Sequence, residues 1–302
     1  MLTTNDRGAG RATLLIVLSA CGFGSLSTLT LFTTRAGLPL LPAMFWRYFL
    51  AAAFLVVVLR GAAYREVTRQ QALRLVLVGG FGQGVITYLS LRALDYLPVG
   101  PLAFLFYTYP AWVALIAAVT GREEVTLWRL LALVIAMAGI VVMVGAPDAA
   151  SLAPVGVVIA LGTAFLYALY LPALQKVQEG VPAMVSTFYL VTGVLIAFLA
   201  GSVFMHELQV PASLTIWKYL VLLSMVSTVL AFATLIAGLR VLGPVRTSII
   251  ATIEPFFTVT LGVLLLGESL TRGTLAGGAM IASAVLLLQW TGRESPVADP
   301  LR

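Results

Sequence analysis

The 302-residue sequence has few of the residues on which most catalytic and metal sites depend. It has one cysteine, Cys21, and one histidine, His206, and only 10% of its residues are charged. A single cysteine excludes an intramolecular disulfide, and the same scarcity excludes the ordinary zinc and haem ligand sets. A glycine-rich phosphate loop of the GxxxxGK[ST] kind is also missing, so ATP is not the expected energy source. We therefore expect no cofactor and no metal.

Apolar residues dominate instead. Hydrophobic residues make up 61% of the chain, and the mean hydropathy is +1.05. Water-soluble domains do not have this balance. The net charge of +6 comes from basic residues that flank apolar runs, a pattern that reflects membrane topology and gives no indication of nucleic-acid binding. The composition predicts an all-α integral membrane protein in contact with the lipid bilayer.

Ten apolar runs are long enough to cross a bilayer as helices, at about 1.5 Å per residue. The runs are bounded by charged residues, glycine or proline, and the link 145–154 divides them into two groups of five. They cover 12–34, 42–60, 72–92, 97–120, 127–145, 154–174, 183–204, 217–239, 244–266 and 274–291. The sequence thus predicts two five-helix units, 12–145 and 154–291.

The basic residues indicate how the spans are oriented. With the N-terminus inside, most of the 18 lysine and arginine residues lie on the inner side, and only Arg35, Arg92, Lys218 and Arg272 lie outside. This skew predicts that both termini are cytoplasmic. Because five is an odd number, the second unit must enter the membrane in the opposite orientation. The predicted architecture is therefore ten transmembrane helices in two inverted five-helix repeats, a plan common among secondary transporters.

Two of the predicted spans contain a proline near the middle. Pro255 lies in the apolar run 245–266, and Pro110 lies 145 residues earlier, in 97–120. Proline lacks an N–H group and its ring clashes with the carbonyl four residues before it, so both helices are expected to bend. Freed backbone groups at membrane depth are tolerated only against protein or a water-filled cavity. We predict hinges at Pro110 and Pro255, with a solute pathway beside them.

Glu254 precedes the second of these prolines. A charge at the bilayer centre costs about 2.5–3.5 kcal/mol on insertion scales. Glu254 is therefore either a protonated or hydrogen-bonded packing residue, or a group that contacts a substrate amine or binds a proton. Thr247, Ala251, Glu254 and Thr258 follow the spacing i, i+4, i+7, i+11, which predicts one polar helical face.

Arg47 is a second charge inside a predicted span. It lies a few residues from the start of 42–60, so we favour an interpretation in which its side chain snorkels to the outer surface. The alternatives are a contact with an anion, or a salt bridge to Glu254 or Asp95.

Polar and aromatic residues recur at helical spacing in several spans, which is typical of helices that line a cavity. Tyrosines in membrane helices also act as interface anchors or packing residues, and that alternative stays open. The candidate substrate-binding residues are Gln83, Thr87, Tyr88, Tyr107, Thr163, Tyr167, Tyr170 and Glu254.

Two GxxxG patterns predict close contacts between helices. They are formed by Gly80 with Gly84 and by Gly273 with Gly277. Small residues at this spacing let helix backbones approach each other. The contacts are expected within one chain as much as between chains, and we expect a monomer.

The two halves resemble a known family. Pro110…Gly121-Arg122-Glu123 and Glu254-Pro255…Leu266-Gly267-Glu268, each followed by a glycine- and alanine-rich final helix, resemble the two EamA repeats of the drug/metabolite transporter superfamily. The resemblance covers about 12–291. It implies inverted five-helix repeats and export of small metabolites across the bacterial inner membrane. Within the family, the chain is most similar to the YddG-type amino-acid exporters.

One feature departs from related proteins. The four-helix small multidrug relatives carry a proton-binding glutamate in their first helix, whereas neither 12–34 nor 154–174 contains an acidic residue. Either Glu254 takes that role, or transport proceeds without a coupling ion. The expected function is secondary export of amino acids or similar small metabolites by alternating access to a midplane cavity. A multidrug or toxic-cation exporter is the alternative, because Glu254 and the aromatic residues suit cations.

Overall fold

The computed structural model describes residues 4–59, 67–93, 95–97, 99–121, 126–144, 153–267 and 272–291, and the regular structure within these ranges is helical. Elements η1 and η3 are π-helical turns. The elements are α1 (Thr4–Arg35), α2 (Leu40–Leu59), α3 (Arg69–Arg74), η1 (Leu75–Phe81), α4 (Gly82–Ala93), α5 (Val99–Phe106), α6 (Tyr109–Thr120), α7 (Leu127–Val144), α8 (Pro154–Val177), α9 (Ala183–Phe204), α10 (Leu214–Ser224), η3 (Met225–Leu230), α11 (Ala231–Ala251), α12 (Glu254–Leu266) and α13 (Arg272–Thr291).

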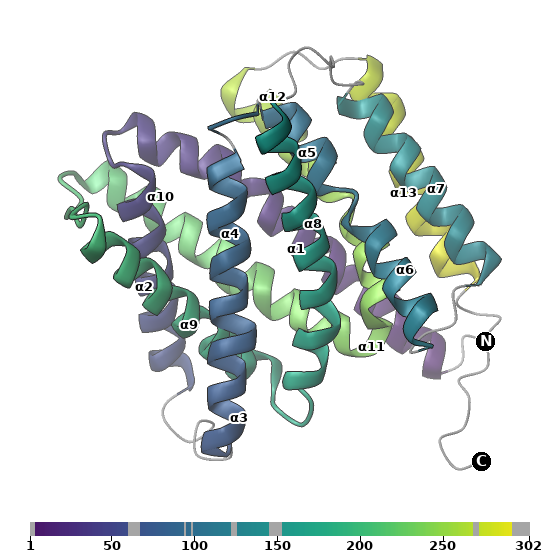
Figure 1. Ribbon diagram of the computed structural model, residues 1–302, viewed down its shortest axis with the longest axis horizontal. Helices are drawn as coiled ribbons and strands as arrows, with labels where there is room; N and C mark the ends of the chain where they lie inside the picture. The colour runs from purple at the N-terminus through teal and green to yellow at the C-terminus, as the bar shows by residue number, and fades with distance from the viewer. Residues whose placement is uncertain are drawn as a thin grey trace.

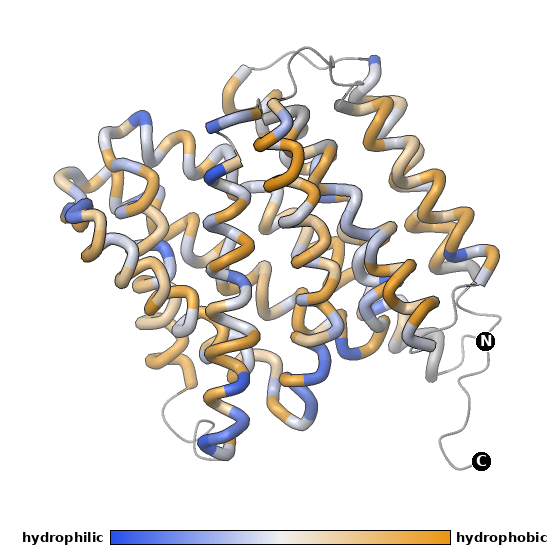
Figure 2. The backbone as a smooth tube through the Cα atoms, in the orientation of Figure 1, coloured by the Kyte–Doolittle hydropathy of each residue, from blue (hydrophilic) through white to orange (hydrophobic). Residues whose placement is uncertain are grey.

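The helices have the surface of a membrane protein. Among the described residues, six helical stretches are long and apolar enough to cross a membrane, and four shorter apolar helices accompany them. Large apolar side chains such as Val119, Phe204 and Leu214 are 79%, 80% and 85% exposed on the outside of the bundle. Hydrophilic residues gather mainly at the helix ends (Figure 2). Burial of this surface in lipid explains the composition, and the chain is an integral membrane protein.

Helices from the two halves of the chain pack side by side. Helix α7 lies along α13 at one edge of the bundle (Figure 1), and α2 packs against α9. Helix α1 contacts α10, η3, α11 and α12, while α8 contacts η1, α4, α5 and α6. The halves therefore form one bundle, with α1 and α8 near its centre.

Two of these contacts require glycine. A Cβ atom on Gly80 would lie 2.5 Å from the Cα of Gly193, between η1 and α9. A Cβ on Gly277 would lie 2.4 Å from the carbonyl oxygen of Gly139, between α7 and α13. Both distances are too short for any side chain. The close helix contacts predicted from the GxxxG patterns are thus confirmed at Gly80 and Gly277.

The two π-helical turns lie inside long helices. A π turn accommodates an extra residue, which rotates the residues beyond it around the helix axis and changes backbone hydrogen bonding. The hydroxyl of Tyr170 donates to the carbonyl of Gly79 in η1, at 2.8 Å. In η3, the hydroxyl of Thr228 donates to the carbonyl of Leu223, at 3.3 Å. The Nη2 of Arg47 donates to the carbonyl of Ser227 in η3, at 2.7 Å, so side chains bond to the backbone of both turns.

The two proline-containing spans are broken instead of bent. Helix α5 ends at Phe106 and α6 begins at Tyr109, while α11 ends at Ala251 and α12 begins at Glu254. Each proline occupies the first turn of the new helix, where its missing N–H group is not needed. This start is more favourable than a strained bend, because the proline ring no longer faces a helical carbonyl.

The break also changes the expected polar face around Glu254. Thr247 and Glu254 lie on opposite sides of the interruption at Thr252 and Ile253, so the prediction of one continuous face is wrong. Helix α11 has a further interruption at Gly243, whose φ of 74° is in the left-handed region that favours glycine.

Candidate functional site

Glu254 and Arg47, the two charges predicted inside the membrane, line one cavity of about 160 Å³. The cavity lies among α1, α2, α4, α5, α6, α8, α11 and α12, beside the helix breaks. Its neutral polar lining consists of Ser19, Gln83, Thr87 and Ser90. Its apolar and aromatic lining consists of Ala20, Phe23, Leu26, Tyr48, Ile86, Phe106, Tyr109, Tyr167, Phe232, Leu235 and Ala251.

Glu254 is the first residue of α12, a position that the helix break creates. The positive end of a helix dipole favours a carboxylate. The phenol of Tyr107 lies beside the carboxyl group. The backbone carbonyl of Glu254 accepts the hydroxyl of Thr258 at 3.2 Å. The side chain has no counter-cation among the residues that the structure describes.

Arg47 is 1% exposed, so the predicted snorkelling to the outer surface is wrong. Its Nε donates to the Thr228 hydroxyl at 2.6 Å, and its Nη2 donates to the Ser227 carbonyl at 2.7 Å. Its guanidinium carbon lies 4.8 Å from the ring centroid of Tyr48. The π turn η3 supplies both oxygen acceptors. These contacts compensate for desolvation of the guanidinium group, so the side chain is stable inside the bundle without reaching the aqueous surface.

The salt bridges considered for Arg47 are not formed either. Asp95 pairs with Arg92, at 2.6 Å, in an exposed position. Within the described part of the chain, neither Asp95 nor Glu254 forms an ion pair with Arg47. Arg47 and Glu254 therefore face the same cavity without neutralising each other.

Aromatic rings form one wall of the cavity. The rings of Tyr109 and Tyr167 meet edge to face, with centroids 4.8 Å apart, and Phe106 lies 5.5 Å from each. The Tyr109 hydroxyl is directed at the carbonyl of Ser248, at 3.4 Å. The sequence analysis did not select Tyr109, although it precedes Pro110 just as Glu254 precedes Pro255. That correspondence was the signal that could have identified it.

The structure brings together several of the predicted site residues. Gln83, Thr87, Tyr167 and Glu254 line the cavity, and Tyr107 is linked to it through Glu254. The amide of Gln83 donates to the Thr87 hydroxyl at 3.4 Å. These five residues come from four separate segments, so only the fold places them in one site.

Three further predicted residues, like Tyr107, are not part of the cavity lining. The Thr163 hydroxyl donates to the Ile159 carbonyl at 2.7 Å, within its own helix. Tyr170 stacks on Tyr167, but its hydroxyl donates to Gly79, and Tyr88 is 48% exposed on the bundle surface. The hydroxyls of Thr163 and Tyr170 thus bond to the protein backbone, and the side chain of Tyr88 faces outward from the bundle.

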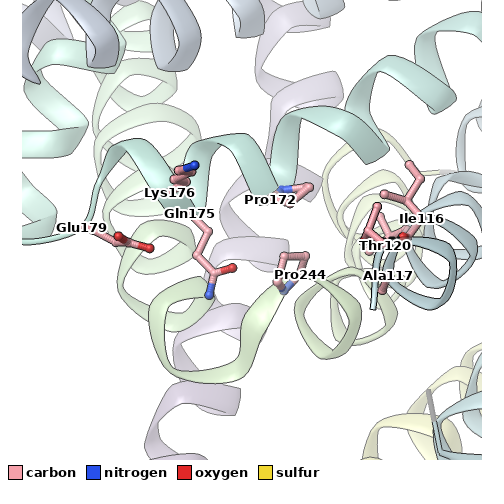
Figure 3. Close-up of a pocket in the computed structure, with 9 residues that line it drawn as sticks. Ile116, Ala117, Thr120, Pro172, Gln175, Lys176, Glu179 and Pro244 are labelled. Atoms are coloured by element: carbon pink, nitrogen blue, oxygen red, sulfur yellow. Dashed lines mark hydrogen bonds between the residues drawn. The ribbon is translucent and has the colours of Figure 1, made fainter. Parts of the chain in front are cut away.

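A second, larger cavity of about 240 Å³ lies near the ends of α6 and α8. Figure 3 shows Pro172 of α8 and Pro244 of α11 within this cavity, between Gln175 on one side and Thr120 on the other. It contains none of the predicted site residues. We take the smaller cavity as the candidate site, because both buried charges face it and isolated charges at membrane depth are retained for function.

Comparison with known proteins agrees with this picture. The model of the EamA-like transporter family matches residues 10–145 and again 154–290. An uncharacterized transporter of Archaeoglobus fulgidus is 27% identical over 272 residues, which cover 90% of this chain and 94% of the relative. An uncharacterized transporter of Synechocystis sp. is 25% identical over 256 residues, which cover 78% and 76%.

A protein of known crystal structure has the same fold. It superposes with a TM-score of 0.75 over 94% of this chain and 98% of its own, at 20% sequence identity. The family match covers most of the sequence, in two segments that follow each other along the chain. The chain therefore belongs to the EamA-like transporter family.

Proposed function

We propose that this protein is a secondary transporter that exports amino acids or similar small metabolites across the bacterial inner membrane. The observation that carries the proposal is the cavity at the two helix breaks, where Glu254, Arg47 and an aromatic wall meet. Broken helices at membrane depth, with polar groups facing a cavity, are the usual solute sites of secondary transporters.

The proposed architecture is ten spans in two inverted five-helix repeats, with both termini in the cytoplasm. The helix contacts support it. Helix α1 meets α10 and α11 of the second half, as α8 meets η1 and α4 of the first, and the breaks before α6 and α12 occupy corresponding positions. Such exchanged pairing is expected where a two-fold axis lies in the membrane plane.

The proposed path follows one face of α6. Tyr109 lines the charged cavity, while Val113, Ile116, Ala117 and Thr120 line the second cavity. These positions follow helical spacing along a single face. In the proposed topology the end of α6 is on the cytoplasmic side, so the second cavity is the proposed entrance. Movement of α6 and α12 about hinges at Pro110 and Pro255 would then expose the solute alternately to the two sides.

The size of the cavity favours small solutes over bulky drugs. An engineered cavity of about 150 Å³ holds benzene, whereas drug-sized ligands occupy sites of about 300–1,000 Å³. The charged cavity is about 160 Å³. A toxic-cation exporter remains the second candidate, because Glu254 and the tyrosines suit a cation. Arg47 in the same cavity opposes it by repulsion.

Substitution Glu254→Gln tests the proposal. It keeps the shape of the side chain but removes the charge, so amino-acid flux into proteoliposomes should fall about tenfold or more, consistent with loss of a charged hydrogen bond. Glu207→Gln, at an exposed loop position, is the matched control and should keep full flux. Wild-type flux of amino acids by the Glu254→Gln variant would contradict the proposed role, and transport of quaternary ammonium compounds alone would favour the second candidate.

A further inference from the structure

We infer that Arg47 and Glu254 recognise the two charged ends of a zwitterion, so that the substrates are free α-amino acids with an uncharged side chain. The inference rests on the proposed function and specifies its substrate class. Arg47 would bind the α-carboxylate and Glu254 the α-ammonium group.

The hydrogen bonds of Arg47 leave it able to bind an anion. A guanidinium group has five N–H donors in a planar fork. Nε and Nη2 each donate to an oxygen of η3, and Nη1 contacts only the weakly accepting sulfur of Met44, at 3.7 Å. Donors on Nη1 and Nη2 thus remain without an oxygen acceptor in the described part of the chain. They belong to a side chain that is 1% exposed and lines the cavity.

The position of Arg47 makes its unpaired N–H donors energetically costly. Arg47 is seven residues into α2, about 10 Å along its axis, so its charge is well inside the span. A buried cation without an anionic partner loses most of its hydration, and its polar contacts compensate only in part. A carboxylate that accepts two parallel N–H bonds is the ligand whose geometry matches the fork of an arginine.

Glu254 is in the complementary situation on another helix. Its carboxylate lies at the start of α12, beside the phenol of Tyr107, and the described residues provide no cation. One cavity therefore holds a positive and a negative group that do not pair with each other. A ligand with only one charge would satisfy one group and be repelled by the other. A zwitterion satisfies both.

The remaining lining selects the third substituent of the ligand. Phe23, Leu26, Ile86, Phe106, Phe232 and Leu235 surround the two charges with apolar surface. A further charge on the ligand would have no partner among them. Among the uncharged polar groups of the cavity, Gln83 and Thr87 bond to each other, and the hydroxyl of Ser19 donates to the carbonyl of Ala231. The expected substrates are thus small to medium apolar amino acids.

Competition for leucine flux tests this inference. The flux of labelled leucine into proteoliposomes is measured in competition with two analogues. The amide lacks the carboxylate, and the deaminated acid lacks the ammonium group. If leucine gives no flux, the amino acid with the largest flux takes its place. For the wild-type protein, each analogue should compete at least about tenfold more weakly than the amino acid, because a charged hydrogen bond is lost.

Two variants should separate the two ends. In Arg47→Gln, the ratio of the affinity for leucine to that for leucinamide should fall toward one. The preference for leucine over 4-methylpentanoate, its deaminated acid, should persist. Glu254→Gln should show the reverse pattern. Arg92→Gln, which removes an exposed arginine, is the matched control and should keep both preferences.

The outcomes distinguish this inference from the proposed function. Wild-type flux of amino acids that leucinamide and leucine inhibit equally would overturn the inference and leave amino-acid export standing. Unchanged preferences in a folded Arg47→Gln variant would also overturn the inference. If that variant does not fold, the competition measured on the wild-type protein tests the inference by itself. Absence of flux for every amino acid would overturn the proposed function itself.

Discussion

Two tyrosines of α8 that stack on each other, Tyr167 and Tyr170, should differ in what the loss of the hydroxyl group changes. Tyr167 lines the charged cavity, and its hydroxyl has no partner among the described residues. Tyr170 is buried, and its hydroxyl donates to the Gly79 carbonyl at 2.8 Å. We expect Tyr167→Phe to weaken solute binding and Tyr170→Phe to lower the free energy of unfolding.

The structure sets the expected size of both effects. Tyr170→Phe removes the hydrogen bond that the buried Gly79 carbonyl of the π turn accepts from the phenol. Hydrogen bonds between membrane helices contribute about 0.6 kcal/mol on average and at most about 1.7. The unfolding equilibrium constant should therefore rise roughly 3- to 16-fold. Tyr167→Phe removes a group that meets only the cavity, so KM should rise about two- to tenfold, from a net hydrogen-bond contribution of about 0.5–1.5 kcal/mol.

The assay combines unfolding in detergent with flux measurements on the same preparations. Tyr88→Phe is the matched control, because this tyrosine is 48% exposed and removal of its hydroxyl should change neither quantity. A higher KM with unchanged stability in Tyr170→Phe would refute the structural role of Tyr170. Equal losses of stability in both variants would refute the assignment of Tyr167 to a wet cavity.

Two further predictions concern packing and topology. Gly193→Ala should lower the free energy of unfolding, because the new Cβ would lie 2.3 Å from the Val76 carbonyl oxygen. Gly201 lies in the same helix and has no atom near its Cβ position. Gly201→Ala should therefore raise the free energy of chemical unfolding by about 0.4–1 kcal/mol. Equal effects of the two would mean that α9 and η1 do not approach closely. In a cysteine-free background, a cysteine introduced by Glu179→Cys should react with an impermeant thiol reagent only from the cytoplasmic side, and one introduced by Leu208→Cys only from the outside. Labelling of both from one side would contradict the proposed topology.

Local chemistry made much of the membrane architecture predictable. An apolar run must satisfy its own backbone in lipid, so it forms a helix, and a proline inside the run must interrupt that helix. The interruptions at Pro110 and Pro255, and the position of Glu254 at one of them, followed from these rules. Their exact form did not, because a proline is compatible with a bend or with the first turn of a new helix, and packing decided for the second.

Sequence by itself thus determined that this protein is helical and membrane-embedded, that two of its helices are interrupted, and that Glu254 lies at such a point. Tertiary structure alone decided which side chains share the cavity. The π turns η1 and η3 insert residues that rotate the following helix faces, so helical spacing could not show that Thr228 would meet Arg47 or that Tyr170 would meet Gly79. A buried charge is stable wherever acceptors surround it, and for Arg47 those acceptors come from a segment 180 residues away in the sequence.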